Sequence, residues 1–171
     1  MPLARVPVVE RVVAGQWAVG DAARRSEWLD DLLTRITAVA AESVGAADAA
    51  YWRIDAGRAT LIGGLRTRLP EDAEAQALRL HAELGSAESL ISPASPEDPE
   101  RQVLAVVWRA GGVRLGICCA YGPGEPDGFN DDDALVLRVI SNSCGNVVER
   151  QQALERLRWA TDDLQESEVR L

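Results

Sequence analysis

Apolar positions recur at helical spacing in two separate stretches of the chain. Residues 21–44 carry them three or four positions apart, which predicts an amphipathic helix with one buried face. Asp21 is a suitable N-cap for this helix and Gly45 a natural C-terminal stop. A second helix is predicted over residues 71–84, after Pro70 and before Gly85.

Two pairs of apolar runs predict β-hairpins. Residues 49–54 and 59–65 flank Asp55-Ala56-Gly57, and residues 103–109 and 113–121 flank Ala110-Gly111-Gly112. Short turns of this kind join antiparallel strands. The second pair is almost continuously apolar, which is typical of central strands.

A long C-terminal helix is the clearest single element. Asn130 is its predicted cap, and the following Asp131, Asp132 and Asp133 complement the helix dipole. No proline follows Asn130, so the pattern permits one helix of about 60 Å. Its leucines fall on the alternating three- and four-residue steps of a coiled coil, with polar Thr161 and Glu168 interrupting the pattern. We refer to the following residues as the heptad seam: Ile140, Val147, Leu154, Leu157, Leu164 and Leu171.

Two segments lack a clear pattern. Residues 1–20 contain Pro7 and Gly15 among their valines, and we interpret them as a loosely docked arm or a short entering helix. Residues 92–100 carry three prolines, which favour a loop, either a lid or a surface linker.

Composition excludes several classes of function. The net charge of −9 disfavours nucleic acid and direct membrane contact as partners. All basic residues are arginine, so there is no lysine for a Schiff base or a phosphate loop. The three cysteines do not form a spaced disulfide framework, and no run approaches the length of a membrane helix, so we expect a cytoplasmic protein.

The order of elements, together with Leu115-Gly116-Ile117 and the helix start from Phe129 to Asp133, resembles the C-terminal half of GAF domains. The sequence GAADAAYWRID at 45–55 is similar to the beginning of such a domain, and the likeness covers about residues 27–150. In addition, LQESEVRL at 164–171 is similar to linker helices that precede PAS domains of bacterial sensor kinases.

This resemblance implies an α+β fold with an antiparallel sheet of five or six strands flanked by helices. We expect an N-terminal arm over 1–20, a GAF-like sensory domain over 21–150 and a linker helix over 151–171. The implied function is a sensory or regulatory domain of a signal-transduction protein, a sensor histidine kinase of a two-component system being our first expectation. The chain would then be part of a larger protein, form a homodimer and pass a signal to a downstream PAS or kinase domain.

Four residues are candidates for binding a small molecule: Trp52, His81, Trp108 and Tyr121. The aromatic residues either line a ligand cavity or fill the core. His81, the only histidine, either binds haem iron or an anionic ligand or has a structural role. The identity of a ligand or cofactor stays unknown at this stage, and no catalytic residue and no metal site is predicted.

Two other functions stay open. The segment between the hairpins, which builds much of the pocket in GAF domains, is short here and favours a ligand-free dimerisation or spacer module. A thiol-dependent methionine sulfoxide reductase would use Cys118 or Cys119, because one GAF-like family reduces this substrate with cysteines. Its thiols need an exposed site, whereas adjacent cysteines on a central strand are usually buried.

Overall fold

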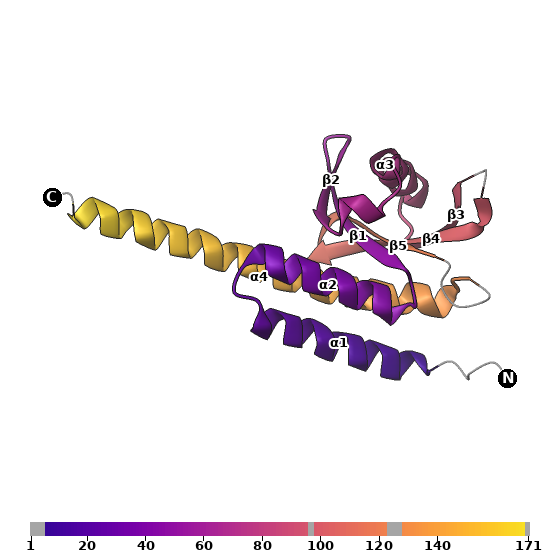
Figure 1. The fold of residues 1–171 in the computed structure, drawn as a ribbon, viewed down its shortest axis with the longest axis horizontal. Coiled ribbons are helices and arrows are strands. Elements are labelled where there is room, and N and C mark those ends of the chain that lie inside the picture. The colour runs from indigo at the N-terminus through magenta and orange to yellow at the C-terminus, as the bar shows by residue number, and fades with distance from the viewer. Residues whose placement is uncertain (1–5, 96–97, 123–127, 170–171) are drawn as a thin grey trace.

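The computed structural model describes residues 6–95, 98–122 and 128–169. Its centre is a five-stranded antiparallel sheet in the order β2-β1-β5-β4-β3. Helix α3 lies on one side of the sheet and helices α1, α2 and α4 lie on the other (Figure 1). The predicted α+β fold is confirmed.

The five strands are β1 (Asp48–Asp55), β2 (Arg58–Gly63), β3 (Ser89–Ser95), β4 (Asp98–Ala110) and β5 (Val113–Tyr121). Both predicted hairpins are present, and each has a two-residue turn. Ala56 and Gly57 in one turn, and Gly111 and Gly112 in the other, all have positive φ. Turns with positive φ at both central residues match the twist of antiparallel strands, which explains the glycines at these positions.

Residues 92–95 and 98–100 are not the loop that the prolines predicted but parts of β3 and β4, whereas residues 96–97 of that segment lie outside the described residues. Pro93 pairs with Gln102 in the antiparallel β3–β4 ladder, and Ser95 pairs with Asp98. β3 is the last strand of the sheet, and an edge strand accepts proline because one side of its backbone needs no partner.

Of the two alternatives predicted for residues 1–20, the structure has the helix, α1 (Val8–Arg25), which is longer than expected; residues 1–5 lie outside the described residues. The inner face of α1, which includes Val12, Val19 and Ala22, packs into the core, so this segment is neither short nor loosely docked. Asp21 lies within α1 and is not the cap of the next helix. That helix, α2 (Leu29–Ser43), begins after Trp28, where the chain turns.

The remaining helices follow the prediction closely. Helix α3 (Ala73–Leu84) ends at Gly85, which has a φ of 53°. Helix α4 (Asp131–Val169) is continuous over 39 residues. Asn130 Oδ1 accepts a hydrogen bond from the Asp133 N–H, and Asp133 Oδ2 accepts one from the Asn130 N–H, both at 3.0 Å. This reciprocal pair is a capping box, and it fixes the start of α4.

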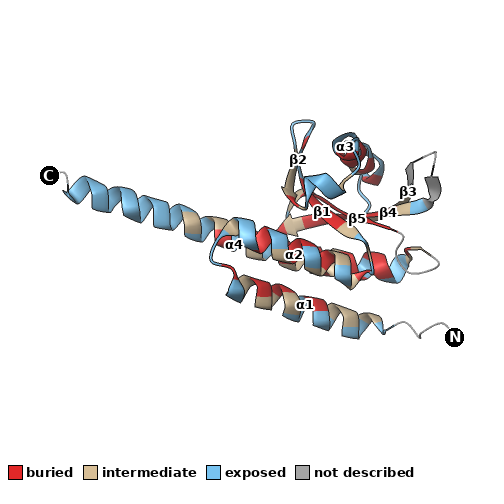
Figure 2. Ribbon diagram, viewed as in Figure 1, coloured by how far each residue is buried: buried red, intermediate tan, exposed pale blue. Residues whose placement is uncertain are grey.

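The core has two parts, one on each side of the sheet. Alternating strand residues pack against α1, α2 and α4 on one side and against α3 on the other. Gly145 brings α4 so close to the sheet that a Cβ at this position would overlap the carbonyl oxygen of Arg109. The buried part of α4 ends at Gln151, and beyond Glu155 the helix extends away from the domain with every described residue exposed (Figure 2).

No helix within the described residues is long and apolar enough to cross a membrane.

Candidate functional site

The face of the sheet that α3 covers contains two of the predicted ligand residues. Trp52 of β1 and Tyr121 of β5 are buried there, together with Leu80 and Ala77 of α3. Period-two alternation predicts Tyr121 on the same side as Leu115, Ile117 and Cys119. The structure confirms Ile117 and Cys119, but Leu115 packs against the core on the opposite side, because the pairing of β5 with β4 shifts register between Trp108 and Arg109. The face is largely apolar, with Gln76 of α3 as a further buried polar residue.

Two polar atoms on this face have no hydrogen-bond partner among the described residues. Trp52 Nε1 and the Tyr121 hydroxyl are both inaccessible to solvent and unpaired within the described part of the chain. The Trp52 N–H interacts with the Tyr121 hydroxyl and so partly offsets the rise in the Tyr121 pKa, although this contact does not have the geometry of a hydrogen bond. Burial, with a contribution from Cys119, raises that pKa well above its usual value. Buried unpaired groups of this kind cost stability, and a ligand that offers a polar atom would relieve that cost.

Trp108 does not join this group. It lies on the opposite side of the sheet, where its ring meets that of Tyr51 edge to face at 5.1 Å. Its Nε1 donates to the carbonyl oxygen of Trp52 at 3.0 Å, across the strands. Trp108 therefore connects the strands within the core and has no access to the α3 face.

His81 lies on α3 and is half-buried. Burial lowers its pKa, and the nearby Arg114 guanidinium lowers it further. Arg114 donates from Nη1 to the carbonyl oxygen of Gly85 at 2.9 Å, which satisfies the C-terminal end of α3. The lowered pKa favours the neutral imidazole, which can both accept and donate a hydrogen bond.

The cysteines are in the wrong environment for thiol chemistry. Cys118, Cys119 and Cys144 are all free and fully buried. Burial raises the pKa of Cys118 and of Cys144 to about 12, and it raises that of Cys119 as well. A reactive cysteine needs an accessible thiolate near neutral pH, and these three have neither property.

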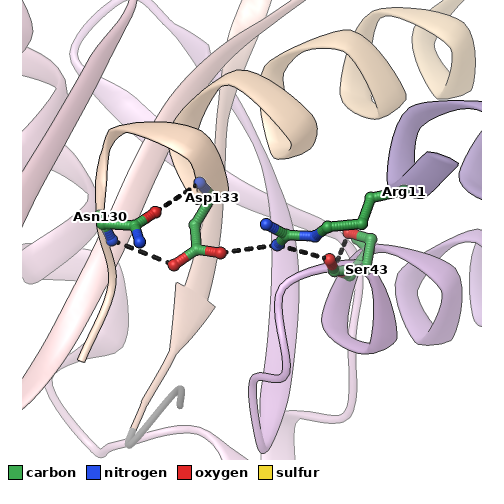
Figure 3. Close-up of polar contacts among 5 residues, drawn as sticks. Arg11, Ser43, Asn130 and Asp133 are labelled. Carbon is green, nitrogen blue, oxygen red and sulfur yellow. Dashed lines mark hydrogen bonds and ion pairs between the residues drawn. The ribbon is translucent and has the colours of Figure 1, made fainter. Parts of the chain in front are cut away.

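A second polar centre was missed by the sequence analysis. Figure 3 shows Arg11 of α1 reaching between the end of α2 and the start of α4, where its Nη2 donates to Ser43 O at 2.9 Å and to Asp133 Oδ1 at 2.6 Å. Asp133 was predicted only as a helix-start acid. Its partner Arg11 lies in the segment predicted as an arm, and no local pattern relates residues 122 positions apart.

The heptad seam divides into a buried and an exposed part. Ile140 is fully buried in the core, and Val147 is partly buried and packs against the same core. Leu154, Leu157 and Leu164 are exposed, whereas Leu171 lies outside the described residues. Only the exposed leucines are accessible to a partner helix in this structure.

The connection between α1 and α2 is attached to α4 near the point where α4 leaves the domain. Gln151 Nε2 donates to Glu27 O at 2.8 Å, and the Leu29 N–H donates to Glu155 Oε1 at 2.7 Å. The guanidinium of Arg158 lies 5.5 Å from the centre of the Trp28 ring, within the range of a cation–π contact. These contacts couple the orientation of α4 to the position of the connection between α1 and α2.

Comparison with known proteins identifies the fold. No family model and no curated protein sequence matches the chain. Among solved structures, the GAF domain of a phosphoenolpyruvate-protein phosphotransferase from Acinetobacter aligns over 85% of this chain and 97% of its own, with 14% identity and a TM-score of 0.63.

Two further solved structures align over most of their length. The GAF domain of a putative sensor histidine kinase from Pseudomonas syringae pv. tomato aligns over 90% of this chain and 92% of its own, with 10% identity and a TM-score of 0.58. The free methionine-R-sulfoxide reductase from Neisseria meningitidis, in complex with its substrate, aligns over 90% and 99%, with 15% identity and a TM-score of 0.58. The sheet order, the helix placement and these alignments together show that this chain has the fold of a GAF domain.

Proposed function

We propose that this chain is a sensory or regulatory domain of a signal-transduction protein and that α4 carries the signal away from it. The observation that supports this most directly is the division of α4. Its first part is buried against the sheet, α1 and α2, and its last part is exposed. A rigid helix that is continuous between core and solvent transmits a change in the core as a change of position or register outside it.

The proposed ligand site is the α3 face around Trp52 and Tyr121. Its support is a pair of buried polar groups, Trp52 Nε1 and the Tyr121 hydroxyl, that make no hydrogen bond of good geometry within the described residues and lie in a largely apolar region. Ligand sites are mostly apolar with a few polar groups that fix orientation, which fits this face. The reductase from Neisseria meningitidis was solved in complex with its substrate, so a protein of this fold can bind a small molecule.

The proposed partner of the exposed helix is a second copy of the chain. Leu157 and Leu164 are seven residues apart on one side of α4, as in a parallel coiled coil. In a homodimer, the two helices would continue into a downstream PAS or kinase domain. We further propose a cytoplasmic setting for such a parent protein.

Measurement of the native mass and the oligomeric state tests both parts of this proposal. We expect a dimer by light scattering, and bound small molecules would appear as added mass or absorbance. Leu157→Glu should give a monomer, because it places a charge in the seam. Trp159→Glu is the matched control, since Trp159 is similarly exposed, at 72% against 64% for Leu157, but lies outside the seam. If the unsubstituted chain is a monomer, the proposal that two copies pair through α4 is wrong.

The ligand-free spacer module is the second candidate. It is favoured by the close packing of the α3 face, where Trp52, Leu80 and Ile117 have no exposed surface. A Tyr121→Phe variant separates the two candidates. In a spacer, removing an unpaired hydroxyl should be neutral or stabilising. In a ligand-binding domain, it should weaken the retention of any bound molecule seen by native mass.

We propose that the chain is not an enzyme. The burial of all three thiols supports this, although one protein of the same fold is a reductase. Alkylation of the native protein with iodoacetamide should leave Cys118 and Cys119 unmodified. Rapid modification of either residue would reopen the possibility of thiol catalysis.

A further inference from the structure

A cavity of about 400 Å³ lies in the helical layer, on the opposite side of the sheet from α3. It opens between α1, the C-terminal end of α2 and the first turn of α4. Its apolar walls are Val6, Ala14, Ala18, Val39 and Val44. The volume is within the range of sites that hold small organic molecules.

The small residues of α1 create this space. Ala14 and Ala18 line the cavity, and Gly15 lies between them. The same glycine allows α1 to approach Ile140 of α4 closely, because a Cβ there would overlap the Ile140 side chain. The short side chains of α1 thus have two effects: they let α1 pack closely on α4, and they leave space for the cavity.

Among the described residues that line the cavity, Arg11 carries the positive charge, and only part of its guanidinium is hydrogen-bonded. Arg11 Nη2 donates to Ser43 O and to Asp133 Oδ1, as Figure 3 shows. Within the described part of the chain, Arg11 Nε and Nη1 make no hydrogen bond, and neither atom is among the buried unpaired groups. A guanidinium already held in place by two acceptors can offer these remaining donors to a carboxylate at little further cost in side-chain entropy.

Acidic side chains also line the cavity. Glu10 of α1 and Glu42 of α2 line it, and both are exposed. The C-terminal end of α2 also contributes the partial negative charge of its last carbonyl groups. The cavity thus combines a positive group, a negative rim and an apolar wall.

We propose that this cavity binds a small zwitterion, an α-amino acid with an apolar side chain. The ligand carboxylate pairs with Arg11, its ammonium group faces Glu10 and Glu42, and its side chain packs against Val39 and Val44. Because the site touches α1, α2 and the beginning of α4, occupancy favours the arrangement in which these three helices are held together. This site is separate from the α3 face and does not depend on a ligand there.

Calorimetric titration with three compounds tests the proposal. L-valine carries both charges, isovalerate lacks the amine and isobutylamine lacks the carboxylate, while the apolar bodies are alike. We expect L-valine to bind and each single-charge analogue to bind at least about tenfold more weakly, because each analogue lacks one of the two charge-assisted contacts. Equal binding of all three, or no binding of L-valine at millimolar concentration, would overturn the proposal.

Variants assign the binding to this cavity. Ala14→Phe should abolish it by filling the space without changing any charge, and Glu42→Gln should weaken it severalfold. Glu149→Gln is the matched control, because Glu149 is also exposed but lies away from this cavity. Circular dichroism confirms that each variant is folded. Binding that survives Ala14→Phe, or that is lost instead in Tyr121→Phe, would place the ligand elsewhere and overturn the assignment.

Discussion

Glu155, on the emerging part of α4, accepts a hydrogen bond from the backbone N–H of Leu29, 126 residues earlier, at 2.7 Å. Leu29 is the first residue of α2, and its N-cap residue Trp28 provides no side-chain hydrogen bond. A negative carboxylate at a helix N-terminus is favourable, because it pairs an unsatisfied N–H and complements the helix dipole. α4 therefore supplies the cap that α2 lacks in its own sequence. A movement of α4 at this position changes the stability of α2.

The first prediction concerns this cap. Glu155→Ala should lower the free energy of unfolding by about 0.5–2 kcal/mol, the usual cost of losing an N-cap acceptor. Urea denaturation followed by circular dichroism measures it. Glu155→Gln should lose less, because an amide oxygen still accepts a hydrogen bond. Glu166→Ala, on the exposed end of α4, is the control, and an equal effect there would mean that the cap contributes nothing.

Elements that depend on neighbouring residues were predictable from the sequence. The capping box of Asn130 and Asp133 spans one helical turn, and both hairpin turns are set by two adjacent residues. The continuous α4 follows from the absence of proline after Asn130. In each of these cases the determining interactions lie within a few positions, so a sequence pattern is sufficient.

Features that depend on distant partners were not predictable in this way. The valines of α1 indicate no clear periodicity because both faces of that helix carry them, one face against the core and the other toward solvent. Alternation within β4 predicts which residues share a side but not which side faces α3, so Trp108 was grouped with Trp52. The ion pair between Arg11 and Asp133 requires knowledge of the packing of α1 on α4.

The second prediction uses two glycines of the same helix. Gly15→Ala should destabilise the protein by roughly 1–3 kcal/mol, the usual cost of overpacking, because the new methyl group overlaps the buried side chain of Ile140. Gly20→Ala should stabilise it by up to about 1 kcal/mol, since alanine has the higher helix propensity and its Cβ meets only Arg24 Nη1 at 3.6 Å. Thermal and urea denaturation of the two variants measures the difference.

The overlap has its own control. If contact with Ile140 causes the loss, the additional substitution Ile140→Val should recover part of the stability lost in Gly15→Ala. A Gly15→Ala variant as stable as Gly20→Ala would show that α1 does not approach α4 as closely as the structure has it.

The third prediction concerns the ion pair of Arg11 and Asp133, whose side chains are 15% and 2% exposed. Arg11→Met removes a charge-assisted hydrogen bond to an almost fully buried carboxylate, so it should lower the free energy of unfolding by about 1.5–3 kcal/mol. Asp133→Asn should lower the free energy of unfolding less than Asp133→Ala does, because the amide oxygen can still accept the hydrogen bond from the Asn130 N–H. The double variant should be more stable than the sum of the two losses predicts. Strict additivity in this double-mutant cycle would contradict a direct pair.

The fourth prediction is a pH dependence that reports on His81. Burial and, to a smaller extent, Arg114 place its pKa below the usual value of 6.5. The unfolded chain therefore binds a proton at higher pH than the folded one, and stability falls as the pH drops from above 6.5 toward the folded pKa. His81 is the only histidine in the sequence, so its ring signals in a proton NMR titration need no assignment by mutation.

Arg114→Gln should raise the pKa of His81 part of the way toward 6.5, because it removes the nearby positive charge and leaves the burial. Arg58→Gln, at an exposed position in the β1–β2 hairpin, should leave the pKa unchanged. His81→Gln should remove the loss of stability that accompanies the protonation of His81. A His81 pKa at or above 6.5 in the unsubstituted protein would mean that the imidazole is neither buried nor close to Arg114. The C-terminal end of α3 would then be more open than the structure describes.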